Sequence, residues 1–216
     1  MSHAALHPVV AEATLLMEQL EPEPEHVRQV CFLARHLFQQ LEHLHQLEVE
    51  DLPYLEAASL LHDVGWTRAE NGSAHHKHSA DIIREHSWKT LNHEETDLVA
   101  QIARYHRKSL PKYSHLPFRE LRPALRHKLL SLAALIRVAD ALDRSHRSLV
   151  RSIECQFRSG ACELIATIDG VAPEEKDAFI KKRDLFELHF STKLEPLFLE
   201  SPEAIQPTPR QSLKSV

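Results

Sequence analysis

The stretch that decides the fold is Leu55 to Gly65, read LEAASLLHDVG, in which an apolar, helix-forming run ends in an adjacent His62-Asp63 pair. An imidazole and a carboxylate at the end of one helix can both reach a single metal ion. Gly65 follows two residues later and is typical of a helix end. The pair is a weak signal alone, so its meaning depends on the histidines and aspartates that the fold brings to it.

The composition predicts a mainly α-helical globular protein. The 216 residues allow one domain with an appendage or two small domains, and 43% of them are hydrophobic, enough for a proper core. Only 4 glycines and 6% aromatic residues favour helices over sheets. The formal charge of -5 argues against general binding to a nucleic-acid duplex or an acidic membrane.

The cysteines and the hydropathy pattern indicate a cytoplasmic protein. The 3 cysteines lack the spacing of a metal site, and no signal peptide precedes them, which suits a reducing compartment. No apolar run approaches the roughly 20 residues needed to cross a bilayer. We therefore expect no membrane association.

Apolar residues at helical spacing predict a bundle of helices before residue 151. The predicted helices cover about 1–20, 24–46, 53–63, 76–87, 93–106 and 123–151. Asn92 and Glu95 have the spacing of a capping box. The basic segment 107–123 contains three prolines and is expected to be a loop.

Beyond residue 151 the hydrophobic period changes to two, which predicts a β-hairpin turning on Ser159-Gly160. The predicted facing pairs are Phe157 with Cys162, Cys155 with Leu164, and Ile153 with Ala166. A helix should follow from Pro173 to about 190. We expect a helical domain over 1–150, a hairpin-and-helix appendage over 151–200 and a flexible tail over 201–216. The open hairpin edge offers a surface for homodimer formation.

Six candidate metal ligands lie at or near predicted helix ends or, for Asp140, on the apolar face of a helix. They are His26, His62, Asp63, His78, His106 and Asp140. An unpaired carboxylate on an apolar face is costly, so Asp140 requires a cation. Any one of these histidines alone is more often a surface residue, and we expect His75, His76 and His93 to face solvent.

The order of these candidates resembles the HD-domain phosphohydrolases, which are named for the adjacent His-Asp pair. A closer resemblance lies in HHKHSADII (75–83), IARYHRKSLP (102–111) and RVADALDRSH (137–146). These strings are similar to the C-terminal HD-type domain of the exopolyphosphatase/guanosine pentaphosphatase family, over roughly residues 10 to 190. In that family hydrolysis is assigned to an actin-like ATPase-fold half, which has no counterpart in these residues. The family's activity therefore does not transfer directly.

The resemblance implies a ligand assignment. It gives His26, His62, Asp63 and Asp140 to one metal, and His78 and His106 to a second, with Asp63 bridging. Because this chain has the complete set, the helical domain itself is expected to bind one or two divalent ions. Imidazole and carboxylate ligands suit Mn, Fe, Co or Zn, and Mg is a further candidate.

Basic residues near the expected site are candidates for contact with substrate phosphates. They are Arg107, Lys108, Lys112, Arg144 and Arg147. Asp143 and His146 follow Asp140 closely and are candidates for orienting a ligand imidazole. Two ions roughly 3.5 to 4 Å apart can activate water and stabilise a phosphoryl group.

These features together predict a metal-dependent phosphohydrolase in which Asp63 and His62 are central to catalysis. The expected substrate is a nucleotide or another small phosphoester or phosphoanhydride, and the resemblance adds guanine alarmones and polyphosphate. The alternative is a non-catalytic regulatory module that binds metal and nucleotide or polyphosphate, or docks on an actin-like phosphatase partner.

Overall fold

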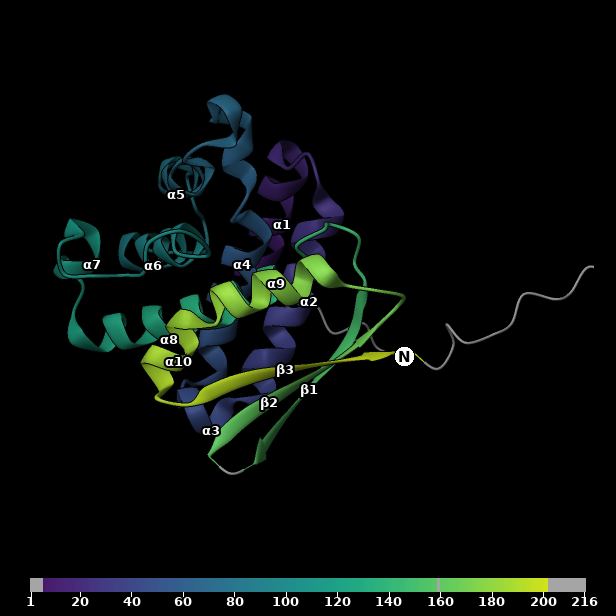
Figure 1. Ribbon diagram of the computed structural model, residues 1–216. Helices are drawn as coiled ribbons and strands as arrows, with labels where there is room; N and C mark the ends of the chain where they lie inside the picture. The colour runs from purple at the N-terminus through teal and green to yellow at the C-terminus, as the bar shows by residue number, and fades with distance from the viewer. Residues whose placement is uncertain (1–5, 159, 202–216) are drawn as a thin grey trace, which may run out of the picture.

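The computed structural model describes residues 6–158 and 160–201, and it confirms a mainly α-helical protein with a small C-terminal β element (Figure 1). The helices before residue 150 are α1 (Pro8–Leu20), α2 (Pro24–Gln40), α3 (Glu42–His45), α4 (Leu52–Leu61), α5 (His75–Glu85), α6 (His93–Arg104), α7 (Leu116–Glu120) and α8 (Pro123–Ala141). Most of the predicted tail, residues 202–216, lies outside the described residues. Among the described helices, none combines the length and the apolar character of a membrane-spanning segment.

Helix boundaries follow local sequence signals. Proline stands in the first turn of α2, α4 and α8, where its missing N–H costs nothing. The predicted capping box is present, because Glu95 N donates to Asn92 Oδ1 at 3.0 Å and Asn92 N donates to Glu95 Oε2 at 2.8 Å. The single helix expected over 24–46 is interrupted at Leu41, and α8 ends at Ala141, before the expected boundary near 151.

The opening stretch forms the central helix of the bundle. α4 packs against α1, α2 and α6, and α2 also packs against α8. Leu55, Ala57, Ala58 and Leu61 are all fully buried, as expected for a helix covered on every side. The end of α4, where the His-Asp pair follows, therefore lies inside the bundle.

The C-terminal sheet has the order β1 (Val150–Arg158), β2 (Ala161–Ile168) and β3 (Lys193–Glu200). β1 and β2 are antiparallel, and their register confirms the three predicted pairs. β3 was not predicted, and it pairs parallel to β2. The connection runs through α9 (Pro173–Lys182) and α10 (Asp184–Phe190), which form the helix expected over 173–190 with a break at Arg183.

The appendage packs directly on the bundle. α9 and α10 lie against α8 (Figure 1), and Phe179 and Phe186 are fully buried. Arg137 of α8 is 3% exposed and donates to Asp184 at 2.9 Å and to Tyr105 O at 3.2 Å. The division at residue 150 stays a prediction, but one hydrophobic core continues across it.

Candidate metal centre

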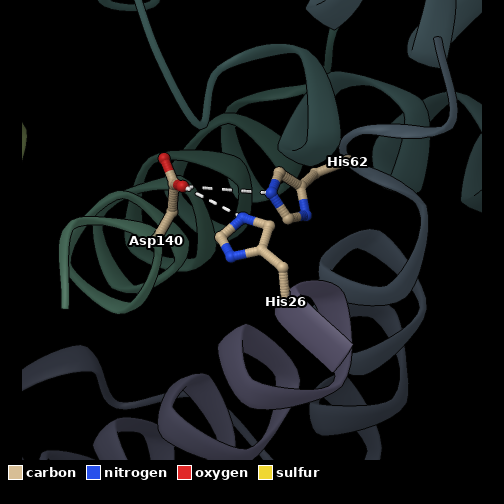
Figure 2. Close-up of side chains that lie close together, drawn as sticks. All are labelled: His26, His62 and Asp140. Atoms are coloured by element: carbon tan, nitrogen blue, oxygen red, sulfur yellow. Dashed lines mark ion pairs between the residues drawn. The ribbon is translucent and has the colours of Figure 1, made fainter. Parts of the chain in front are cut away.

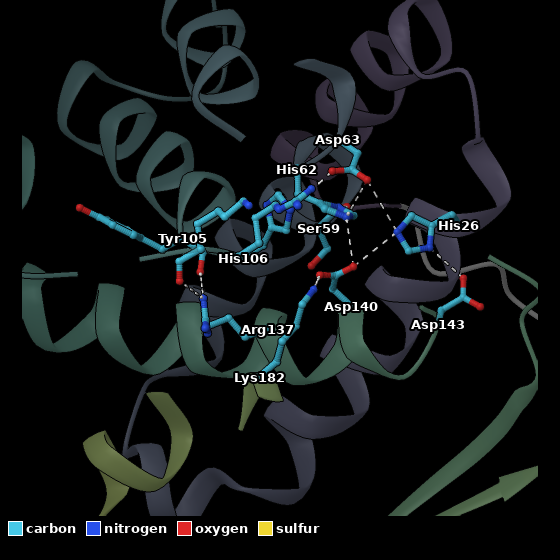
Figure 3. A network of polar contacts seen from close by, with 12 residues as sticks. His26, Ser59, His62, Asp63, Tyr105, His106, Arg137, Asp140, Asp143 and Lys182 are labelled. Atoms are coloured by element: carbon cyan, nitrogen blue, oxygen red, sulfur yellow. Dashed lines mark hydrogen bonds and ion pairs between the residues drawn. The ribbon is translucent and has the colours of Figure 1, made fainter. Parts of the chain in front are cut away.

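Six histidines and aspartates of the described residues meet at a buried point in the bundle, and none is more than 6% exposed. They are His26 of α2, His62 and Asp63 after α4, His75 of α5, His106 after α6, and Asp140 of α8. Five of them belong to the predicted ligand set, and His75 was not expected. Figure 3 shows His26, His62, Asp63, His106 and Asp140.

The first group of donors surrounds Asp140. Its Oδ1 lies 3.6 Å from His26 Nε2 and 4.0 Å from His62 Nε2 (Figure 2). Asp63 joins the same group through Oδ2, which is 3.9 Å from His26 Nε2 and 3.6 Å from His62 Nε2. Two imidazoles and two carboxylates thus present one atom each to the same small volume.

The second group of donors uses the other oxygen of Asp63. Its Oδ1 lies 3.2 Å from His75 Nε2 and 3.5 Å from His106 Nε2. The two oxygens of one carboxylate therefore face two different pairs of imidazoles, as a carboxylate that bridges two cations would.

Hydrogen bonds on the side away from the centre orient the four imidazoles, because each ring donates its Nδ1–H to a fixed acceptor. The acceptors are Asp143 Oδ2 for His26 at 2.9 Å, Ser59 O for His62 at 2.8 Å, Gly72 O for His75 at 3.0 Å and Ala103 O for His106 at 2.7 Å. This tautomer leaves the Nε2 lone pairs of His26, His62 and His106 facing the centre, whereas His75 Nε2 accepts from Arg107 Nη1 at 2.9 Å.

Some of these buried atoms lack a hydrogen-bond partner within the described part of the chain. They are His26 Nε2, His62 Nε2 and Asp63 Oδ1. Buried polar atoms normally have hydrogen-bond partners, so unpaired ligand atoms that face one another require an explanation. Nitrogen and carboxylate ligands in this arrangement fit a divalent metal ion.

Protonation in the centre also suits metal binding. Burial lowers the pKa of His62 to about 4, and burial together with His62 holds the pKa of His106 well below its usual value. Burial opposes ionisation of Asp63, but His62, His75 and His106 keep the pKa of Asp63 well below its usual value. Neutral imidazoles and ionised carboxylate are the forms that bind metal.

The structure corrects the expected contribution of α5. His78 lies half-buried further along the helix, and within the described residues it makes no ion pair with Asp63, whereas His75 Nε2 lies 3.2 Å from Asp63 Oδ1. His75 and His76 are 1% and 9% exposed, so the expectation that they face solvent is wrong, whereas His93 is exposed as expected. The place expected for His78 beside His106 is taken by His75.

Gly65 explains why α5 comes so close to the His-Asp pair. A Cβ on Gly65 would lie 2.1 Å from His75 O and 2.4 Å from Ser79 N, and Gly65 N donates to Ser79 Oγ at 2.9 Å. α4 has already ended at Leu61, so the role assigned to Gly65 as helix terminator is corrected to that of a close-packing position.

Asp143 and His146, expected behind the ligands, both contact His26. Asp143 accepts from its Nδ1–H, and its other oxygen accepts from Ser148 N at 2.7 Å. The ring of His146 stacks on that of His26 with centroids 3.7 Å apart, and its Nδ1 pairs with Glu23. His26 is thereby held on two sides.

A cavity of about 960 Å³ opens over the centre. Of the basic residues expected to contact phosphate, Arg107, Lys108 and Arg144 line this cavity. Lys112 and Arg147 are exposed and are not among its lining residues, so their contact with phosphate stays a prediction.

The appendage adds Lys181 and Lys182 to the cavity wall, and neither was expected from the sequence. The Lys182 ammonium pairs with Asp140 (Figure 3). Burial, and then the charges of Arg137 and Arg107, lower the pKa of Lys182 to about 7. In the sequence, Lys182 stands in a charged stretch typical of a solvated helix face, so no pattern distinguished it.

One known protein family matches most of this chain. The family described as Ppx/GppA phosphatase, domain III, matches residues 11–190, which include every candidate ligand and the appendage through α10. No curated protein matches the chain. Because the match covers most of the 216 residues, the chain belongs to the Ppx/GppA phosphatase domain III family.

Proposed function

We propose that this protein is a divalent-metal-dependent phosphohydrolase that acts on small phosphoesters or phosphoanhydrides. The observation that carries the proposal is the set of unpaired buried atoms, His26 Nε2, His62 Nε2 and Asp63 Oδ1, which converge beneath a cavity lined by both basic and acidic side chains. Membership of a phosphatase family supports the reaction class.

The two groups of donors assign the ligands. His26, His62, Asp140 and Asp63 Oδ2 would hold one ion. His75, His106 and Asp63 Oδ1 would hold a second, for which His75 Nε2 would give up its hydrogen bond from Arg107. When bound, such ions lower the pKa of water and neutralise charge on phosphoryl oxygens.

The chain's own side chains would bind and orient the substrate. Arg107, Lys108 and Arg144 supply positive charge to phosphate oxygens from one wall, and Lys181 supplies it from α9. Trp66 is 42% exposed at the cavity and stacks on His75 with centroids 4.4 Å apart. Its ring offers a flat surface for a base, which keeps nucleotides, guanine alarmones included, beside polyphosphate as substrates to test.

A second candidate function is a binding module without catalysis, which holds nucleotide or polyphosphate or docks on an actin-like phosphatase partner. The Lys182 contact favours it, because the ammonium already supplies Asp140 with a positive partner. Such a module would bind phosphates through its basic residues and need no ion.

Metal content and turnover together test the proposal. The full chain is purified without chelator and saturated with manganese, and its metal content is measured by elemental analysis. We expect two ions per chain, metal-dependent turnover in a phosphoester and phosphoanhydride screen, and loss of both an ion and turnover in Asp63→Asn. Asp81→Asn, an exposed position on α5, is the control.

The outcomes separate the candidates. One ion per chain with turnover would indicate a mononuclear hydrolase and move His75 and His106 to substrate binding. Phosphate binding without turnover would favour the binding module. Absence of metal, or turnover that is unchanged in Asp63→Asn, would contradict the metallohydrolase.

A further inference from the structure

Arg107 belongs to two pockets. One is the large cavity over the metal centre, and the other is a separate pocket of about 270 Å³. The walls of this second pocket include His76, Lys77, Arg104, Tyr105, Arg107 and His115. No carboxylate is found among the described residues that line it.

The cations of the second pocket form no close ion pair with a carboxylate in the described part of the chain. Within the described residues, no carboxylate oxygen lies within 4.0 Å of the charged nitrogens of Lys77, Arg104 or Arg107, whereas Arg84 pairs with Asp97 at 2.7 Å. Like charges gathered around one hollow repel each other, and an anion between them relieves that repulsion. The charge pattern therefore selects a ligand with several negative oxygens.

The second pocket also holds hydrogen-bonding groups that the protein leaves unused. His76 is 9% exposed, and its Nδ1 has no partner within the described part of the chain. Tyr105 Oη and His115 Nδ1 are 2.9 Å apart, and this pair uses only one of its two polar hydrogens in either tautomer of neutral His115. The remaining hydrogen is free to donate to a ligand.

We propose that this pocket is a second phosphate site, which holds one phosphate group of a molecule whose other end lies over the metal centre. Arg107 lies between the two positions, and its Nη1 is 2.9 Å from His75 Nε2. A volume of about 270 Å³ is at the small end of ligand pockets, roughly 300 to 1,000 Å³, and suits a phosphate group more than a nucleoside.

The inference rests on the proposed function and narrows its substrate class. Substrates with phosphate groups at two separated positions, such as a linear phosphate chain, would engage both pockets. A monophosphate would engage only one. The chain is therefore expected to discriminate by the number and spacing of phosphates.

Binding of inorganic phosphate and of tripolyphosphate to the full chain tests this site, by calorimetry in metal-free buffer. We expect tripolyphosphate to bind one per chain, and Arg104→Gln and Lys77→Gln each to weaken it, with Arg104→Gln losing at least about tenfold. Arg119→Gln removes the same charge from an exposed position outside the pocket and should change affinity less than twofold.

Two results would overturn the proposal. Equal effects of Arg104→Gln, Lys77→Gln and Arg119→Gln would show that only net charge matters. Inorganic phosphate that binds at Arg104 without competing with tripolyphosphate would show a site for free phosphate. This measurement needs no turnover. If the chain proves not to be a hydrolase but tripolyphosphate affinity still depends on Arg104, the phosphate site stands and only the proposed function fails.

Discussion

Replacing Gly65 with alanine is expected to disturb the metal centre through the backbone of α5. The new Cβ would lie 2.1 Å from His75 O, against 3.4 Å for ordinary contact, so the first turn of α5 must retreat by about 1.3 Å. Two of the three nearest atoms are backbone and cannot rotate away. Overpacking of this kind costs about 1 to 3 kcal/mol of unfolding free energy.

The same displacement should weaken metal binding, because it moves His75 relative to Asp63 Oδ1. Loss of ligand positioning typically costs about 10- to 100-fold in affinity. Manganese titration by calorimetry and urea unfolding of the metal-free protein by circular dichroism measure the two effects separately.

Gly170→Ala is the control for Gly65→Ala. Gly170 has φ +80° with open space around its Cβ position, so alanine there should cost about 1 kcal/mol of stability through backbone strain and leave metal affinity unchanged. Unaltered manganese binding in Gly65→Ala would refute the role of α5 in the centre, and unaltered stability would refute the close contact itself.

Further predictions concern the surroundings of the centre. Asp143→Ala removes the acceptor for His26 Nδ1–H, and manganese affinity measured by calorimetry should fall about 10- to 100-fold. Lys182→Met leaves Asp140 without its buried partner, so the metal-free protein should lose roughly 3 kcal/mol in urea unfolding, and manganese should restore more stability to the variant than to the wild type. Burial lowers the pKa of His189 to about 4. Between pH 6.5 and 4, His189 therefore binds a proton in the unfolded chain but not in the folded chain. Stability should therefore fall as the pH falls through this window, and the urea midpoint of His189→Gln should fall less steeply.

The residues that could be predicted from the sequence are those whose burial follows a simple period. Asp140 stood on an apolar helical face, and it is 4% exposed in the core. Alternation of apolar residues fixed the register of β1 against β2, including the pair Phe157 and Cys162. Each depends on neighbours close in the chain.

The choice between His75 and His78 depended on the rotational phase of α5. A usable signal existed, because His78 shares its helical face with the exposed residues Asp81 and Glu85, whereas His75 precedes the buried Ser79 by one turn. The close approach at Gly65 sets this phase, and it involves atoms that no local pattern displays.

Lys182 and β3 depend on packing between distant segments. Lys182 is brought to Asp140 by the docking of α9 on α8, and β3 pairs with β2 only after the two helices have crossed over the sheet. No hydrophobic period in the charged stretch around Lys182 or in the strand Lys193–Glu200 predicts these contacts.

The docking of α9 has a consequence for how this protein can be divided or recombined. Glu174, Asp177, Lys181 and Lys182 form one wall of the cavity, and all four follow the β-hairpin in the chain. A fragment that stops near residue 150 would keep every candidate metal ligand but lose that wall. Grafting a different C-terminal segment onto the bundle should therefore change which phosphate compounds the cavity accepts while its metal ligands stay the same.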